Sequence, residues 1–168
     1  MSQFEFLLSL YAIVAGLGLS LLVRSVGQII EAWLPHIRAK TLLVANDELA
    51  ADDLRQEIMS LAVPSGITFL CCPVSEATTL LERVRKDDPD QHVLVLFSDC
   101  ADARSAHMSG LPFSLVNIGN LHYGPGKEQV CEHIALGPDD RSCLKYFADH
   151  EVEIDFRCVP TATPKVNL

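Results

Sequence analysis

Three observations predict an α/β fold with a mainly parallel central sheet and helices on both faces. Short apolar, β-branched runs recur along the chain without a polar alternate position. Segments with helical periodicity lie between them, and turn-forming residues separate the two kinds of segment. A strand that has no polar face has to be covered on both sides, which is typical of parallel sheets. With 168 residues, the chain can form one domain with a sizeable core and an appendage.

The elements alternate regularly after Lys40. We expect strands at 41–47, 67–73, 92–99 and 113–120, and helices at 48–63, 75–86, 101–109 and 137–150. The segment at 124–136 reads as a loop leading into an extended stretch, and 151–160 alternates and closes the fold. In the helix at 48–63, one side carries four apolar residues: Leu49, Leu54, Ile58 and Leu61.

The amino-terminal segment is unusually apolar. Phe6 to Val23 contains no charged residue over 18 positions, and as a helix it would span roughly 27 Å, enough to cross a bilayer core. Basic residues follow this run and none precedes it, which argues against a signal peptide and would place its carboxy-terminal side in the cytoplasm. The alternative is a buried helix that continues into a core strand at 19–23. Both interpretations stay open, with a domain boundary expected between 1–18 and 19–168.

Charge and cysteine content exclude several classes of function. The formal net charge is −9, and no basic patch with interleaved aromatic residues occurs, so nucleic-acid binding is not expected. The six cysteines include no Cys-x-x-Cys pair, and the histidines show no zinc spacing, so we expect no metal site. Several cysteines lie in apolar stretches, which predicts free, reduced thiols in a cytosolic compartment.

A ligand crevice is expected outside the carboxyl ends of the parallel strands. This rule selects four strand tips: 46–48, 72–73, 98–100 and 117–123. The last tip, Asn117 to Tyr123, is the most suggestive, because a glycine-broken polar tip can present backbone N–H groups to an anion.

Three stretches together resemble a known family. They are GQIIEAWLPHIRAKTLLVANDELAADDLRQEIMSLAVPSGI, LVNIGNLHYGPGKEQV and VEIDFRCVPT. In order and spacing they resemble the IIB component of the mannose/fructose/sorbose family of the bacterial phosphotransferase system. The resemblance covers Leu19 to Pro160.

The resemblance implies an α/β domain that works as a cytoplasmic phosphocarrier without a cofactor. Such a subunit takes a phosphoryl group from a IIA partner on a histidine and passes it to a sugar delivered by the membrane subunits IIC and IID. An imidazole nitrogen is nucleophilic at neutral pH, and nearby Arg and backbone donors would stabilise charge on the phosphoryl oxygens.

The chain departs from the family at the loop that carries this histidine. Family members have Arg-Val-Asp-(Asp/Asn)-Arg-Leu-(Ile/Val)-His-Gly-Gln after the first strand, whereas this chain reads Arg24-Ser25-Val26-Gly27-Gln28. If Arg24 and Gly27-Gln28 are the two edges of that loop, about five residues between them are deleted. Valine then stands where the histidine should precede the glycine, and valine cannot carry a phosphoryl group.

Other residues are weak substitutes for the missing carrier. His122 lies on a crevice tip in a segment resembling the family's Asn-(Ile/Val)-Gly-Gly-Met-His-Tyr, but relatives often have this histidine in addition to the catalytic one. Cys100 also lies on a tip, with no basic neighbour in the sequence to activate it. The residues expected to contact phosphate or a partner are Arg24, Gln28, Asn46, Asp47, Asn117, Gly119, Asn120 and His122.

Four hypotheses follow. The chain is a IIB phosphotransferase subunit by descent; a non-catalytic regulatory or scaffold relative that binds phosphotransferase-system partners; a cytosolic domain tethered to the inner face of the membrane through residues 6–23; or the product of a rearranged or misassigned gene start. The lost loop argues against catalysis.

Overall fold

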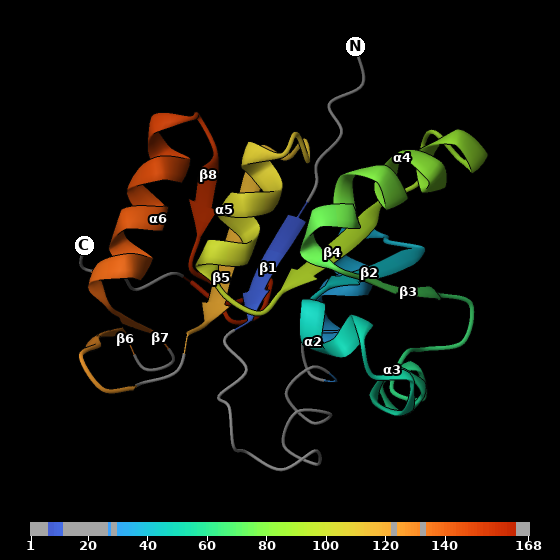
Figure 1. Cartoon of the computed structure of the whole chain (residues 1–168). Coiled ribbons are helices and arrows are strands. Elements are labelled where there is room, and N and C mark those ends of the chain that lie inside the picture. The colour runs from blue at the N-terminus through green and yellow to red at the C-terminus, as the bar shows by residue number, and fades with distance from the viewer. Residues whose placement is uncertain (1–6, 12–26, 28–29, 122–123, 132–133, 164–168) are drawn as a thin grey trace.

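A six-stranded, all-parallel sheet forms the centre of the molecule (Figure 1). The computed structural model describes residues 7–11, 27, 30–121, 124–131 and 134–163. The strand order is β3-β2-β4-β1-β5-β8. The strands are β1 (Leu7–Tyr11), β2 (Thr41–Ala45), β3 (Thr68–Cys72), β4 (Val93–Phe97), β5 (Leu115–Asn120) and β8 (Glu153–Asp155). This confirms the predicted α/β fold with a parallel sheet.

Helices cover both faces of this sheet. They are a helix at 30–37, α2 (Asp47–Ala50), α3 (Asp53–Ser60), the short 3₁₀ turn η1 (Val74–Glu76), α4 (Ala77–Asp87), α5 (Cys100–Met108) and α6 (Pro138–Asp149). The helix at 30–37 and α2–α3 contribute Trp33, Leu49 and Met59 to the core on one face. On the other face, α4, α5 and α6 contribute residues such as Leu81 and Phe147. Successive side chains of a strand point to opposite faces, so β2 and β4, buried at every position, supply both cores.

A small second sheet lies beyond the end of β5. It pairs β6 (Glu128–Cys131) with β7 (Ile134–Leu136) in antiparallel orientation. An isolated parallel bridge joins Leu121 to Ile134, so β7 is held against the carboxyl end of β5. The extended stretch expected at 124–136 is therefore two strands.

The helix expected at 48–63 is broken in two. Asp52 has extended backbone geometry, and its carboxylate accepts a hydrogen bond from the Arg55 N–H at 3.0 Å, so α3 starts afresh after α2 ends. Leu54 and Leu61 are 67% and 81% exposed, whereas Met59 is 3% exposed. The apolar side predicted for one continuous helix is therefore wrong for Leu54 and Leu61, because the break changes which face of α3 meets the sheet.

The amino-terminal apolar run contributes a strand to the centre of the sheet. β1 pairs in parallel with β4 through Leu8 and Val95 and with β5 through Ser9 and Asn117. The predicted apolar helix is wrong at residues 7–11, because an unbroken apolar run suits a strand buried on both faces as well as a helix. Residues 12–26, with the predicted strand at 19–23 and the boundary after residue 18, lie outside the described residues. Among the described helices, none is long and apolar enough to cross a membrane.

Candidate functional site at the carboxyl edge of the sheet

Asn46 ties the ends of β2 and β4 together. Its backbone is extended, and its side-chain Oδ1 accepts a hydrogen bond from the Leu49 N–H at 2.6 Å, which caps α2. The same side chain donates from Nδ2 to the Ser98 hydroxyl. The chain leaves β2 for one face of the sheet and leaves β4 for the other. The Asn46–Ser98 bond therefore lies where the connections diverge, which is where doubly wound sheets form their crevice.

Asp47 extends this edge toward β3. Its carboxylate accepts a hydrogen bond from the Val74 N–H at 2.8 Å, and Val74 begins the 3₁₀ turn that follows β3. The Asn46 N–H donates to the Cys72 carbonyl at 3.0 Å. The tips of β3, β2 and β4 are thus linked by direct hydrogen bonds, and both predicted residues at the β2 tip act in that linkage.

The first turn of α5 makes this edge acidic. Asp99 caps α5 by accepting from the Asp102 N–H at 2.8 Å. Burial raises the pKa of the Asp102 carboxyl to about 6, and the negative charges of Asp99 and Asp47 add to this shift. Three carboxylates therefore lie close together at the tips of β2 and β4, where they disfavour a further anion.

Lys127 does not offset this charge with a free ammonium group. Its Nζ lies 2.9 Å from Asp140 Oδ2, and that carboxylate also accepts from the Gly137 N–H at 2.9 Å. Both side chains are largely buried. The ion pair fixes the start of α6 against the loop before β6. Because Asp140 already balances the charge of Lys127, this lysine does not offset the negative charge at the strand tips.

Asn117 lies within the sheet. It is 1% exposed, and its side-chain Nδ2 donates to the Arg157 carbonyl at 2.9 Å. Arg157 in turn forms a fork with Asp155, with Nη2 to Oδ2 at 2.8 Å and Nε to Oδ2 at 2.9 Å. This contact joins β5 to the segment that follows β8. It assigns Asn117 a structural role, and its predicted role in binding stays a prediction.

The remaining predicted site residues are only partly placed. Gly119 and Asn120 end β5, and Asn120 pairs with Tyr11 at the end of β1, so their backbone reaches the carboxyl edge. Arg24, Gln28 and His122 lie outside the described residues. Their predicted contact with phosphate or a partner stays a prediction.

The histidines that the structure describes lie away from this edge. Each of them lies near the carboxyl end of a helix or the start of a strand. In a parallel α/β sheet, helix carboxyl ends and strand starts lie at the edge opposite the strand tips. His92 Nδ1 contacts the Ile37 carbonyl just before β4, and exposed His36 lies edge-on to Trp33. His107 and His150 contact Tyr146 of α6. None of these four, among the described residues, can reach a phosphoryl group at the strand tips.

Cys100 is at the predicted tip but is not an available thiolate. It is 2% exposed, and burial raises the pKa of its thiol far above the ordinary value, with further contributions from Asp140, Cys143 and Asp99. Burial likewise raises the pKa of Cys71 to about 11 and that of Cys72 to about 12. Cys71, Cys72, Cys100 and Cys143 form no disulfide bond, which agrees with the predicted reduced thiols at those positions.

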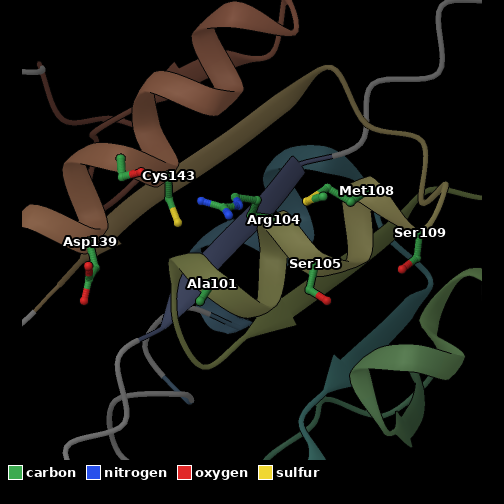
Figure 2. Close-up of a pocket in the computed structure, with 8 residues that line it drawn as sticks. Ala101, Arg104, Ser105, Met108, Ser109, Asp139 and Cys143 are labelled. Atoms are coloured by element: carbon green, nitrogen blue, oxygen red, sulfur yellow. The ribbon is translucent and has the colours of Figure 1, made fainter.

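A separate hollow of about 670 Å³ lies between α5 and α6 (Figure 2). Its wall consists of Ala101, Arg104, Ser105, Met108, Ser109, Asp139, Ser142 and Cys143. In Figure 2 the guanidinium of Arg104 points across this space toward the Cys143 sulfur. The prediction of strand tips did not identify this hollow, because it depends on how two helices pack side by side.

Sequence reasoning also missed Asp102 and the Lys127–Asp140 pair. An Asp at position 99 followed by another at 102, directly after an apolar strand, is a recognisable helix start. It could have indicated the cap, although not the raised pKa, which comes first from burial of Asp102 and then from the charges of Asp99 and of Asp47 at a different strand tip. No sequence signal brings Lys127 next to Asp140.

Residues 22–167 match the family model described as the PTS system sorbose subfamily IIB component. The chain belongs to this family. It is 28% identical over 142 residues to the N-acetylgalactosamine-specific phosphotransferase enzyme IIB component 2 of Escherichia coli strain K12, covering 84% of this chain and 88% of that relative. It is 25% identical to the sorbose-specific EIIB component of Klebsiella pneumoniae, over 84% of this chain and 85% of the relative.

Solved structures show the same fold. The N-acetylgalactosamine-specific IIB component 1 from Escherichia coli superposes with a TM-score of 0.79 at 22% identity, covering 95% of this chain and 97% of that one. An N-acetyl-galactosamine IIB component from Streptococcus pyogenes superposes with a TM-score of 0.77 at 25% identity, covering 97% and 93%. These two superpositions cover 95% and 97% of this chain, whereas the two sequence alignments cover 84% of it.

The predicted deletion in this sorbose-family IIB chain falls on Arg24 to Gln28, of which the structure describes only Gly27, so the deletion stays a prediction. With β1 at Leu7–Tyr11, the fifteen residues 12–26 lie between the first strand and Gly27. The first histidine of the chain is His36, so these fifteen residues contain none.

Proposed function

We propose that this chain is a sorbose-family IIB subunit that binds phosphotransferase-system partners without carrying a phosphoryl group. The single observation behind this proposal is that the connection from β1 to the helix at 30–37 contains no histidine, although the fold around it is that of the family. A phosphoryl carrier in this position needs a nucleophilic nitrogen, and neither Val26 nor any other residue at 12–26 has a side chain that supplies one at neutral pH.

The described part of the carboxyl edge supports the same proposal. Asp47, Asp99 and Asp102 give it negative charge, and Lys127 is already paired with Asp140. A phosphoryl group in transfer needs donors and cations around its oxygens. The linked tips of β2, β3 and β4 form instead a preorganised polar surface, suited to contact with another protein.

IIB components of this family work with IIA and IIC/IID partners, and the curated relatives include a mannose-specific EIIAB component of Escherichia coli strain K12, 24% identical to this chain. We place the chain on the cytoplasmic side, where it would contact a IIA domain through Asn46, Asp47 and the end of β5, and deliver no phosphoryl group to the sugar bound by IIC and IID. The sugar hydroxyls would be recognised by those membrane subunits.

In the experiment, the full chain is incubated with a IIA domain that carries a labelled phosphoryl group. Binding to IIA and transfer of the label to this chain are measured separately. Binding to IIA by calorimetry without acid-labile, base-stable label on this chain supports the proposal. Label that is present in the wild type and absent in His122→Ala supports the competing function, phosphoryl transfer through His122. That residue is the one candidate nucleophile that the resemblance places on a strand tip.

A further inference from the structure

Tyr146 contacts three nitrogen-containing side chains, two histidines and one arginine. Its hydroxyl lies 2.9 Å from His107 Nδ1 on α5, and its ring lies 4.0 Å from that of His150, at a 32° interplanar angle. The Arg104 Cζ atom lies 5.7 Å from the centre of the same ring. Two of these groups come from α5 and one from the end of α6, so the cluster joins the two helices that lie side by side in Figure 1.

The surroundings of His107 are apolar apart from these groups. Its ring packs edge-on against Phe113 at 4.7 Å and against Phe147 at 6.2 Å. The His107 and His150 rings are 6.1 Å apart. Among the described residues, no carboxylate forms an ion pair with either imidazole. Lys145 and Asp149 pair with each other at 3.3 Å on the exposed side of α6. A proton on His107 would therefore lie in this apolar cluster, beside the His150 ring, without a carboxylate partner among the described residues.

The hydrogen bond of His107 depends on its protonation state. A neutral imidazole with its proton on Nε2 accepts the Tyr146 O–H at Nδ1. Once protonated, both ring nitrogens are donors, so the phenol has to turn its hydrogen away and accept instead. His150 Nδ1 lies 2.7 Å from the Tyr146 carbonyl, so the second histidine is held to the same residue through the main chain.

We propose that His107, Tyr146 and His150 form a pH-sensitive joint between α5 and α6, closed when the His107 imidazole is neutral and loosened when it binds a proton. The cluster is independent of the strand tips and of the missing carrier. Loosening would act on the hollow between the two helices, because Arg104 both lines that hollow and lies over the Tyr146 ring.

The direction of the effect follows from the pKa of His107. Burial lowers this pKa below the ordinary value, and the nearby His150 lowers it further. The open form binds protons more readily than the closed form. The joint is therefore stable above the ordinary histidine pKa of about 6.5 and weakens as the pH falls through it toward the lower pKa of the closed form.

The test measures amide hydrogen exchange of the full chain, by mass spectrometry, at about pH 7.5 and about pH 5.5, corrected for the intrinsic pH dependence of exchange. We expect protection of α6 to fall on the order of tenfold more than protection of α4 in the wild type. In His107→Asn, whose amide can still bond the Tyr146 hydroxyl but does not titrate, this difference should be absent. His36→Asn, at an exposed histidine away from the joint, should behave as the wild type.

Two results would overturn the proposal. One is equal pH dependence of α4 and α6 in the wild type, and the other is an unchanged loss of α6 protection in His107→Asn. If that variant does not fold, a carbon-13 titration of the wild-type histidines decides. A His107 midpoint below about 6.5 supports the joint, and a midpoint at or above this value contradicts it.

Discussion

The Asn46 side chain donates to the Ser98 hydroxyl while accepting from the Leu49 N–H at 2.6 Å. One amide thus caps α2 and joins the ends of two neighbouring parallel strands. This relationship fixes the geometry of the carboxyl edge on the side where the connections diverge. It also predicts that the two hydrogen bonds, from Nδ2 to Ser98 and from the Leu49 N–H to Oδ1, contribute separately to stability.

Replacing Asn46 tests that division. Asn46→Ala should lower the free energy of unfolding by about 1–2 kcal/mol, because it removes the cap and the strand-tip bond together. Asn46→Asp keeps the capping oxygen and should cost less. Urea unfolding followed by circular dichroism measures both. Equal losses in the two variants would show that the cap does not contribute, and Ser98→Ala isolates the bond to the β4 tip.

The free energy of unfolding should depend on pH through the carboxyl group of Asp102. Its pKa is raised to about 6 in the folded chain, so the folded state holds this proton more tightly than the unfolded state does. Its contribution to stability is therefore favourable below the unfolded pKa and is lost as the pH rises from about 4 to about 6.

Asp102→Asn should consequently stabilise the protein near neutral pH and change little near pH 4. The expected gain is roughly 1 kcal/mol, a value reduced for solvent screening of this half-buried group. Asp139→Asn is the matched control, since Asp139 is exposed in the first turn of α6. A gain for Asp102→Asn that is the same at both pH values would contradict the raised pKa.

Arg157 should contribute far more to the free energy of unfolding than Arg141, which also forms an ion pair. It forms a fork with Asp155, which is 8% exposed, donates from Nη1 to the Pro160 carbonyl at 3.0 Å and lies over Trp33. Arg157→Ala leaves a buried carboxylate without its partner and should cost about 3 kcal/mol. Arg141 pairs with exposed Glu128 at 3.0 Å, so Arg141→Ala should change stability by less than about 0.5 kcal/mol. Similar losses in the two variants, measured by urea unfolding, would show that burial of the pair does not matter.

The buried thiols should resist alkylation. Because burial raises the pKa of Cys72 to about 12 and that of Cys100 further, very little thiolate forms at these residues near pH 8. Iodoacetamide should leave both unmodified in the folded protein and should modify both after unfolding in urea. Peptide mass spectrometry reads each site separately, and rapid modification of Cys100 in the folded state would show a more open β4 tip.

Periodicity predicted the parallel sheet and most helices because the core strands carry apolar residues at every position. The ends of Thr41–Ala45 and Val93–Phe97 are also readable, since Asn46 and Asp99 follow them as capping residues. The strand at Leu7–Tyr11 was not predictable in type, because an apolar run of 18 residues fits a helix equally well. Its position between β4 and β5 depends on long-range pairing that has no local signature.

The candidate site was predictable only in outline. The rule for parallel sheets selected the tips that carry Asn46 and Asp99, and the structure joins Asn46 to Ser98 and sets Asp47 near Asp102. The same rule selected Asn117, which the structure buries against the Arg157 carbonyl, a partner forty residues away in the sequence. The absence of a histidine before His36 was readable directly from the sequence, whereas the number of residues between the first strand and Gly27 required β1 to be placed.

The most direct measurement is the intact mass of the full chain after incubation with a phosphorylated IIA domain and an excess of phosphoryl donor. A histidine-carrying relative serves as the positive control, and His122→Ala of this chain is run in parallel. We expect no increase in mass for this chain, whereas the relative should gain one phosphoryl group. A single phosphoryl adduct on the wild-type chain, labile in acid and lost in His122→Ala, would contradict it.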